Sequence, residues 1–398
     1  MPEYLSPGVF IEETSFRAQS IEGISTGTTA FVGPTRKGPY GKRPALLTSW
    51  ADFERIYGTC ADLLLATPPE LKRNHVALAV RYYFENGGRR LYVARTRPNR
   101  TRTPPTPADY AAALATLQPL EDLSTLAAPG CTVRWAIDQA ACQDIQAQLL
   151  AFAQEPGTLR FAVLDPPPGL SPGEVRTFRG GLDSSHAALY YPWVTVANPL
   201  ARGSSRQPPT VAVPPSGFLC GIYAGSDLQQ GVFKAPANVP LLGALGPEVT
   251  LSKEQQDLLN PEGINCLRAF EGRGFLVWGA RTLASDPQWK YLNVRRYFNY
   301  LEGSIARSTQ WAVFEPNDEA LWVNLRRIID AFLYNEWRNG ALMGAKPDEA
   351  YFVRCDRSTM TQSDLDNGRL VCLIGVAPLK PAEFIIFRIG QWTADRSA

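Results

Sequence analysis

The sequence predicts a mixed α/β fold. We expect a layered, mostly parallel sheet in a middle domain, an α/β C-terminal domain, and extended strand arms at both chain ends. Three observations lead to this prediction. Strand-like and helix-like segments alternate through most of the chain, two long helical patterns follow them, and both ends carry apolar runs of strand type. Strands that alternate with helices are typical of parallel, layered sheets.

Capping and turn residues define the elements of the first part of the chain. Ser49 with Asp52 forms a capping box, and Gly58 closes the helix that it opens. Residues 98–107 are too rich in proline to form a regular element and are predicted to be a linker. In order, we expect strand 28–32, helix 49–58, helix 74–85, strand 91–95, a helix opening at Thr106, helix 144–154, strand 160–164, a helix opening at Ser171, strand 187–196, a loop over 201–217 and strand 275–279.

The last section opens with two helical patterns, at about 287–309 and 318–340, before strands near 350–354 and 370–376. The second pattern is amphipathic, with apolar side chains on one face and basic or polar side chains opposite. Its apolar face carries Leu321, Leu325, Ile328, Ile329, Phe332 and Trp337, and its opposite face carries Arg327, Tyr334 and Arg338.

The two chain ends are the most informative part of the sequence. A C-terminal strand is predicted with bulky apolar groups on both faces, at Phe384, Ile385, Ile386, Phe387 and Ile389. Terminal segments normally fray, whereas a strand this apolar needs partners on both faces. It must therefore dock into a sheet of its own subunit or of a neighbour, with the segment from Pro378 to Pro381 as the joint that supplies the reach. The N-terminal arm holds a short strand without a local apolar partner, at Val9, Phe10, Ile11 and Glu12.

Composition excludes several classes of protein. A formal charge of +2 over 398 residues is too small to attract nucleic acid or an anionic membrane through the overall electrostatic field of the protein. No apolar run approaches the roughly 18–20 residues that cross a bilayer, and the acidic N-terminus does not resemble a signal peptide. We therefore expect a protein that is made and kept in the cytosol unless lysis or a special route releases it. The odd number and wide spacing of the cysteines predict neither disulfides nor a zinc site; they are Cys60, Cys131, Cys142, Cys220, Cys266, Cys355 and Cys372.

One motif allows an enzyme as the alternative. Gly23-Ile-Ser25-Thr-Gly27 fits the G-x-S-x-G pattern of a serine hydrolase, but that motif needs a strand before it and a helix after it. Here a polar arm precedes Ser25 and a strand follows. His186, after Asp183-Ser-Ser185, is interpreted as part of a polar turn, and His75 as a solvated residue at a helix start. No catalytic, cofactor-binding or metal-binding residue is predicted.

Sequence motifs spread over nearly the whole chain resemble those of tail sheath proteins from contractile phage tails and related injection machines. Each motif is weak alone, but their order along the chain is specific. They are Tyr4–Glu13, Ala30–Pro39, Phe84–Gly88, Ala188–Trp193, Val213–Gly217, Gly231–Asn238, Gly274–Leu283, Tyr291–Arg296, Phe314–Asn317 and the closing pair Gly375–Pro378 and Pro381–Phe384.

The resemblance implies a helical sheath that surrounds an inner tube and contracts to drive the tube through a target envelope. Its implied partners are further copies of itself, the inner tube protein, and baseplate and terminal cap proteins, with no nucleic acid and no direct membrane insertion. Such particles are assembled as phage tails or phage tail-like structures. The chain is short for the family, so large outer decorations are expected to be missing.

The resemblance also implies that both arms are shared with neighbouring subunits and that a helix of the C-terminal domain faces the tube through basic residues. The candidates on that helix are Arg326, Arg327 and Arg338; Arg295 with Arg296 is the competing choice, and an ordinary solvated helix face is the alternative to both. The expected divisions are a 1–22 arm, a 23–97 α/β segment, a 98–108 linker, a 109–285 middle (outer) domain, a 286–377 inner, tube-facing domain and a 378–398 donated strand.

Overall fold

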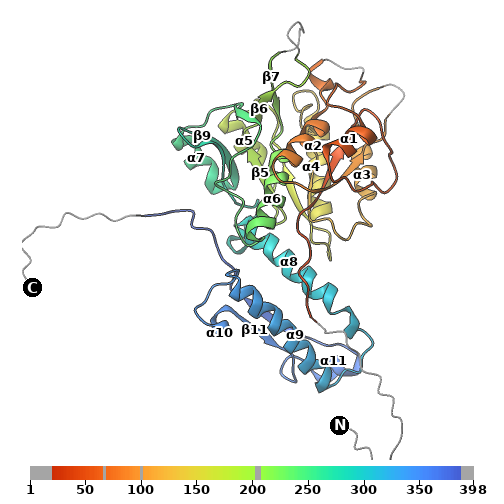
Figure 1. Cartoon of the computed structure of the whole chain (residues 1–398), viewed down its shortest axis with the longest axis vertical. Helices are drawn as coiled ribbons and strands as arrows, with labels where there is room; N and C mark the ends of the chain where they lie inside the picture. Colours follow the sequence, from red (N-terminus) through yellow and green to blue (C-terminus); the bar gives the residue numbers. More distant parts are fainter. Residues whose placement is uncertain (1–19, 66–68, 99–101, 202–207, 387–398) are drawn as a thin grey trace, which may run out of the picture.

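The computed structural model describes residues 20–65, 69–98, 102–201 and 208–386. Figure 1 shows a large α/β lobe and a smaller lobe built around α9 (Glu319–Arg338) and β11 (Tyr351–Arg354). Helix α8 (Leu292–Ser308) runs from the large lobe into the small one. The mixed α/β class predicted from the sequence is confirmed.

A seven-stranded sheet forms the centre of the large lobe. Its strands are β1 Thr28–Gly33, β2 Arg90–Arg95, β3 Thr125–Ala127, β4 Phe161–Leu164, β5 Ala187–Tyr191, β9 Ile264–Phe270 and β10 Gly274–Trp278. They lie in the order β10-β9-β5-β4-β3-β1-β2. All neighbours are parallel except β9 and β10, which form an antiparallel pair. Since β1 lies between β2 and β3, the segments before and after the proline-rich stretch contribute to one sheet.

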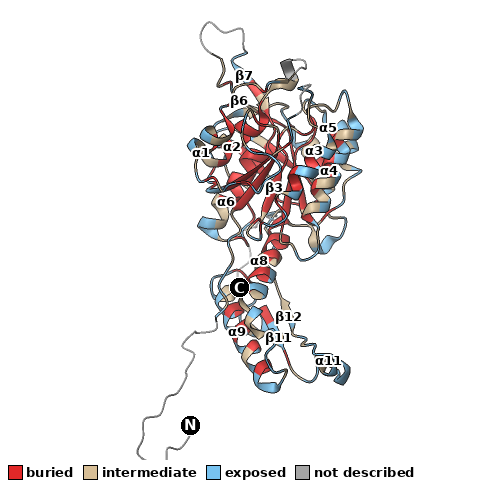
Figure 2. Ribbon diagram, turned by 90° about the vertical axis from the view of Figure 1, so that its right-hand side faces the viewer, coloured by how far each residue is buried: buried red, intermediate tan, exposed pale blue. Residues whose placement is uncertain are grey.

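Helices cover both faces of this sheet, and its strands are buried on both sides (Figure 2). Side chains alternate between two cores: Phe31 of β1 packs with one and its neighbours Ala30 and Val32 with the other. Burial on both faces explains why these strands are mostly apolar rather than alternating with polar residues. The first core includes α1 Trp50–Tyr57, α2 His75–Glu85 and α6 Ser216–Gln230; the second includes α3 Pro107–Ala115, α4 Gln139–Ala153, α5 Pro172–Arg179 and α7 Lys253–Leu259.

Local capping signals placed several helix starts correctly. Thr106 and Ser171 each cap a helix with proline in its first turn, and in both cases a capping box is complete. Short 3-10 helices cover Pro69–Lys72, Asn260–Glu262, Pro287–Trp289 and Gln310–Ala312.

Helix α6 was not expected, because three glycines weaken its helix propensity. They fall four residues apart and form one stripe along the face that meets α2. A Cβ placed on Gly217 would lie 2.5 Å from the Cα of Ala79, and one on Gly221 would lie 2.5 Å from the carbonyl oxygen of Tyr83. The glycines therefore allow the two helix backbones to approach more closely than side chains permit.

One strand prediction and one loop prediction in the middle of the chain were wrong. The segment expected as one strand over 187–196 is divided between β5 and β6 (Val194–Ala197), which belong to different sheets. The expected loop over 201–217 contains β7 (Thr210–Val213). These strands form a second sheet of order β7-β6-β8 with β8 (Ala244–Pro247), and the turn from β5 to β6 at Pro192 redirects the chain between the two sheets.

The small lobe follows the predicted amphipathic pattern. Leu321, Leu325 and Phe332 are buried on the inner face of α9, whereas Arg327 and Arg338 are exposed. This face packs with β11 and its antiparallel partner β12 (Leu373–Val376). The remaining elements of the lobe are α10 Pro347–Ala350 and α11 Gln362–Asp366.

His75 corrects one expectation. It begins α2 after the capping residue Asn74, but it is buried rather than solvated, and its ring packs edge-on against Trp193. Burial, with a smaller contribution from Arg73, lowers the pKa of His75 to about 3. The side chain is therefore a neutral part of the core at physiological pH.

Candidate functional site: the assembly surfaces

The C-terminal arm leaves the body of the protein as an apolar segment without cover. Phe384, Ile385 and Ile386 are 70%, 73% and 79% exposed, and Figure 1 shows the chain running away from both lobes at this point. The structure assigns them to no strand. Phe387 and Ile389 lie outside the described residues. The predicted strand thus finds no partner within the described part of its own chain.

The expected joint from Pro378 to Pro381 is not a free joint in this structure. The backbone N–H of Met343 donates to the carbonyl of Ala377 at 2.8 Å, and Pro378 forms a β-bridge with Leu342. The side-chain amide of Asn293 then donates to the carbonyl of Leu379 at 3.1 Å. The segment therefore lies against its own body, and the freely leaving chain begins further on than the proline spacing suggested.

The residue that ends this attachment is Glu383, which sequence analysis did not single out. Its carboxylate accepts hydrogen bonds from Arg281 at 2.8 and 2.7 Å, from Asn260 at 2.7 Å and from Tyr291 at 3.0 Å. Lys290 lies 3.7 Å away. The sequence offered no indication of this contact beyond a carboxylate directly before an apolar run. Its partner Arg281 is 102 residues away along the chain, so no local pattern connects the two.

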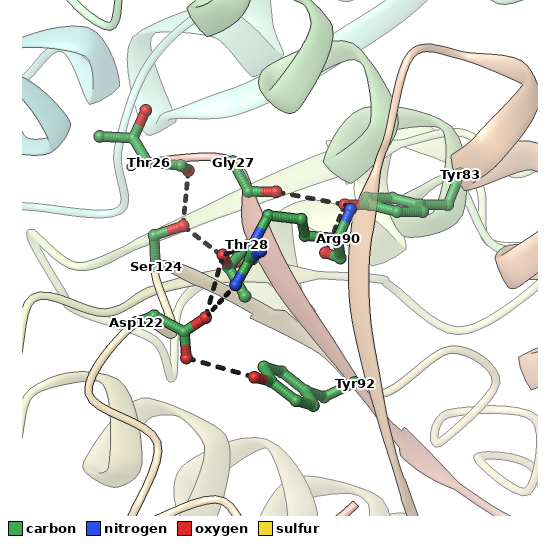
Figure 3. Close-up of polar contacts among 8 residues, drawn as sticks. All are labelled: Thr26, Gly27, Thr28, Tyr83, Arg90, Tyr92, Asp122 and Ser124. Carbon is green, nitrogen blue, oxygen red and sulfur yellow. Dashed lines mark hydrogen bonds and ion pairs between the residues drawn. The ribbon is translucent and has the colours of Figure 1, made fainter. Parts of the chain in front are cut away.

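The root of the N-terminal arm is held by a polar network at the start of β1 (Figure 3). The hydroxyl of Ser124 donates to the carbonyls of Thr26 and Thr28 at 2.5 and 2.8 Å, and the hydroxyl of Tyr83 donates to the carbonyl of Gly27 at 3.2 Å. Arg90 joins the network through Asp122 at 2.8 Å. The predicted strand residues Val9, Phe10, Ile11 and Glu12 lie outside the described residues.

Upstream of this network, the arm root lies along α8. The N–H of Glu22 donates to the hydroxyl of Ser308 at 3.2 Å, and the N–H of Ile24 donates to that of Ser304 at 3.1 Å. The hydroxyl of Thr26 donates to Asp227 at 2.6 Å. The chain that enters β1 thus contacts both α8 and α6.

The small lobe contains an incomplete sheet. In the described part of the chain, β11 and β12 pair only with each other, apart from the bridge between Leu342 and Pro378 just beyond β12. Phe352 is 45% exposed and Leu373 is 50% exposed. An isolated two-stranded sheet is marginal in water, and open edges are templates for further strands.

The basic residues proposed for the tube-facing surface separate into two groups. Arg326, Arg327 and Arg338 are exposed on α9. Arg295 and Arg296 are buried on α8: Arg296 pairs with Asp227, and Arg295 stacks over a tryptophan and pairs with Glu302 at 2.8 Å. Buried and paired side chains are unavailable to a partner, so the competing choice is not supported in this conformation.

The hydrolase alternative has no supporting geometry. Ser25 is exposed in a segment without regular structure that leads into a strand, not into a helix. At the second candidate cluster, Asp183 accepts from the backbone and hydroxyl of Ser285 at 2.9 and 2.7 Å, while His186 contacts its neighbour Ser185 at 3.1 Å. Among the described residues, no cluster of histidine, cysteine and carboxylate side chains could hold a metal ion.

Comparisons with known proteins identify the family of the chain. Residues 104–283 match the phage tail sheath protein central domain, and residues 284–391 match the phage tail sheath C-terminal domain. The tail sheath protein of Vibrio phage KVP40 is 29% identical over 46% of this chain, a match that spans 27% of the phage protein. In the described part of the chain, no helix is both long and apolar enough to cross a bilayer.

Two solved sheath structures match over nearly the full length. The sheath of an extracellular contractile injection system (PVC), in its contracted state, is 31% identical with a TM-score of 0.78 and full coverage of both chains. The contracted helical sheath of the anti-feeding prophage is 32% identical with a TM-score of 0.77, covering 97% of this chain and 99% of that one.

Proposed function

Because the chain belongs to the phage tail sheath family, we propose that it is a structural subunit of a contractile sheath. It polymerises helically around an inner tube by exchanging strands with neighbouring copies, and contraction of the sheath drives the tube through a target envelope. Its further partners are baseplate and terminal cap proteins. The subunit is made in the bacterial cytoplasm, and the finished particle is released by lysis.

The observation that carries this proposal is the exposed apolar run at the C-terminal arm. Three consecutive bulky apolar side chains, Phe384 to Ile386, are at least 70% exposed. A contiguous exposed apolar patch marks an interaction site, and a strand added to an open sheet edge supplies main-chain hydrogen bonds and side-chain pockets together. Strand donation therefore satisfies both the backbone and the side chains of the segment.

The sheet formed by β11 and β12 in a neighbouring copy is the acceptor that fits best. Its edges are open within the described residues, and its exposed apolar side chains include Phe352 and Leu373. A third or fourth strand would convert a marginal pair into a stable sheet. The donor and the acceptor are different surfaces of one chain, so the contact is head-to-tail and extends into an open helical array.

Contraction requires two packings of the same subunits. In this proposal the arms keep neighbours linked while the bodies move from an extended arrangement of higher free energy to a contracted one of lower free energy. The large lobe forms the outer part of the sheath wall. The small lobe faces the tube.

The exposed basic face of α9 is the proposed tube contact. Replacing Arg327 with Glu is expected to weaken tube binding about tenfold at low salt. The substitution replaces a positive charge with a negative one, which would repel an acidic surface on the tube. The loss should shrink as added salt shortens the screening length to about 10 Å or less. Co-sedimentation with purified tube protein measures both effects.

Arg55→Glu is the matched control for that variant, since Arg55 is an exposed arginine on α1 of the large lobe. It carries the same charge change away from the proposed contact. If Arg327→Glu and Arg55→Glu co-sediment equally with the tube protein, α9 is not the tube-facing surface.

Electron microscopy of the purified chain tests the function itself. Negatively stained protein is expected to show helical tubes whose number rises with concentration, because head-to-tail assembly depends on subunit concentration. A hydrolase would instead remain dispersed and would show turnover that Ser25→Ala abolishes. Dispersed particles at all concentrations would refute the sheath proposal.

A further inference from the structure

The segment that leads to the C-terminal arm is a strap across the two lobes. It starts beside the small-lobe sheet, where the N–H of Ala377 donates to the carbonyl of Ala350 at 2.8 Å. It passes Asn293, whose side-chain amide contacts the carbonyls of Phe233 and Leu379. It ends on the large lobe at the Glu383 contacts. Attachment continues up to Glu383, and from the next residue onward the described chain is exposed.

The arginine that binds Glu383 is also held by contacts with other parts of the large lobe. Arg281 has a side chain that is only 8% exposed, and it is fixed by a 2.8 Å hydrogen bond from its guanidinium to the carbonyl of Asn260. Its backbone N–H donates to Asn265 at 2.7 Å. The guanidinium fork therefore meets the carboxylate in a geometry set by β9 and by the turn after β10. Paired N–H donors give such contacts directional specificity as well as strength.

The carboxylate is held in its charged form. Burial acts to raise the pKa of Glu383, but the hydrogen bonds from Arg281 and Asn260 outweigh it and lower the pKa below its ordinary value. Arg281, Lys290, Asn260 and Tyr291 all face the carboxylate with donors. The contact therefore persists at neutral pH.

We propose that Glu383 is the positioning residue for strand donation. Through Arg281 it fixes the point and the direction in which the apolar run from Phe384 leaves the large lobe, so that the run reaches the neighbouring sheet in one register. The inference rests on the proposed function, since it assigns a role within strand exchange.

One carboxylate can affect assembly because it sets the length of unattached chain before the apolar run. Without the Glu383 contact, the last described attachment is the carbonyl of Leu379. Four more residues would then be free, which adds up to about 14 Å of reach. A longer flexible tether lowers the effective concentration of the strand at its acceptor and no longer selects one register.

Glu383→Gln in the full-length chain tests the proposal. The variant is expected to need about tenfold more protein than wild type to form tubes, because the strand loses its fixed origin. Hydrogen exchange of residues 380–383 in the monomer should rise. The thermal stability lost by leaving Arg281 without its carboxylate should be similar to the loss in the control variant below. Glu155→Gln is the matched control: it removes a carboxylate that pairs with a buried arginine, Arg160, at 3.0 Å in the large lobe, away from the strap.

An insertion separates positioning from folding. Gly-Ser-Gly placed between residues 383 and 384 leaves every Glu383 contact intact and adds only slack. It should raise the tube-forming concentration as much as Glu383→Gln does. Tubes at the wild-type concentration from the insertion variant would overturn the proposal, even if Glu383→Gln proves unstable.

The failure of this inference is distinguishable from the failure of the proposed function. If a chain lacking residues 384–398 still forms normal tubes, strand donation itself is wrong. If that truncation abolishes tubes while Glu383→Gln and the insertion assemble like wild type, donation stands and Glu383 has no positioning role.

Discussion

Removal of residues 384–398 is expected to leave a folded protein that forms no tubes. The described part of the deleted segment makes no contribution to the two main cores, and its side chains from Phe384 to Ile386 are exposed. Burying three such side chains in a neighbour is worth about 5 to 9 kcal/mol. Since each 1.4 kcal/mol is tenfold in affinity, the tube-forming concentration should rise more than about 1,000-fold. Sedimentation and electron microscopy measure the loss.

Point substitutions refine this experiment. Ile386→Pro removes a backbone donor and cannot complete a strand ladder, so it should also prevent assembly, whereas Ile386→Val should assemble. Deletion of residues 1–15 is expected to have the same effect as the C-terminal truncation, because the N-terminal arm is proposed to enter the same exchange. If either deletion variant forms normal tubes, the arm that it lacks has no role in strand exchange.

The largest expected loss of stability comes from breaking the ion pair between Arg296 and Asp227. Their side chains are 3% and 5% exposed, and they meet through two hydrogen bonds of 2.9 and 2.5 Å. The pair joins α8 to α6, and the hydroxyl of Thr26 also donates to the same carboxylate. Arg296→Met leaves the buried carboxylate of Asp227 without its cationic partner, which costs about 3 to 5 kcal/mol in the free energy of unfolding. Urea denaturation measures it.

Two further variants make that measurement interpretable. Combining Arg296→Met with Asp227→Leu removes both charges and should recover most of the lost stability, because an apolar pair can replace a buried ion pair. Arg90→Met breaks the more exposed pair with Asp122 and should cost no more than about 1 kcal/mol. Equal losses from Arg296→Met and Arg90→Met would show that the buried pair has no special role in joining α8 to α6.

Much of the fold could be predicted because its signals are local. The capping hydroxyls of Thr106 and Ser171, each followed by a proline, mark the starts of two helices. The spacing of Leu321, Leu325 and Phe332 predicts the buried face of α9. Helix α6 could not be predicted in the same way. Its glycines are unfavourable for an isolated helix, and their use becomes clear only when α2 lies against them.

The candidate surfaces were likewise predictable only where the signal is a local pattern of residues. The exposed run from Phe384 to Ile386 and the basic face at Arg327 were both visible as patterns of residue type. The choice between Arg327 and Arg296 was not, because both are arginines on amphipathic helices. Only the packing of α8 against α6 shows that Arg296 already has a buried partner.

The sequence by itself determined that an apolar run of strand type lies near the C-terminal end, and from this run it predicted a strand that needs a partner. Such a run is visible in the sequence because it is a property of neighbouring residues. The tertiary structure alone decided where that strand begins to be free. Pro378 and Pro381 suggested a joint, but Glu383 binds Arg281 across 102 residues of chain and moves the free segment to Phe384. A contact between distant segments depends on how the whole chain folds, so no local pattern could have revealed it.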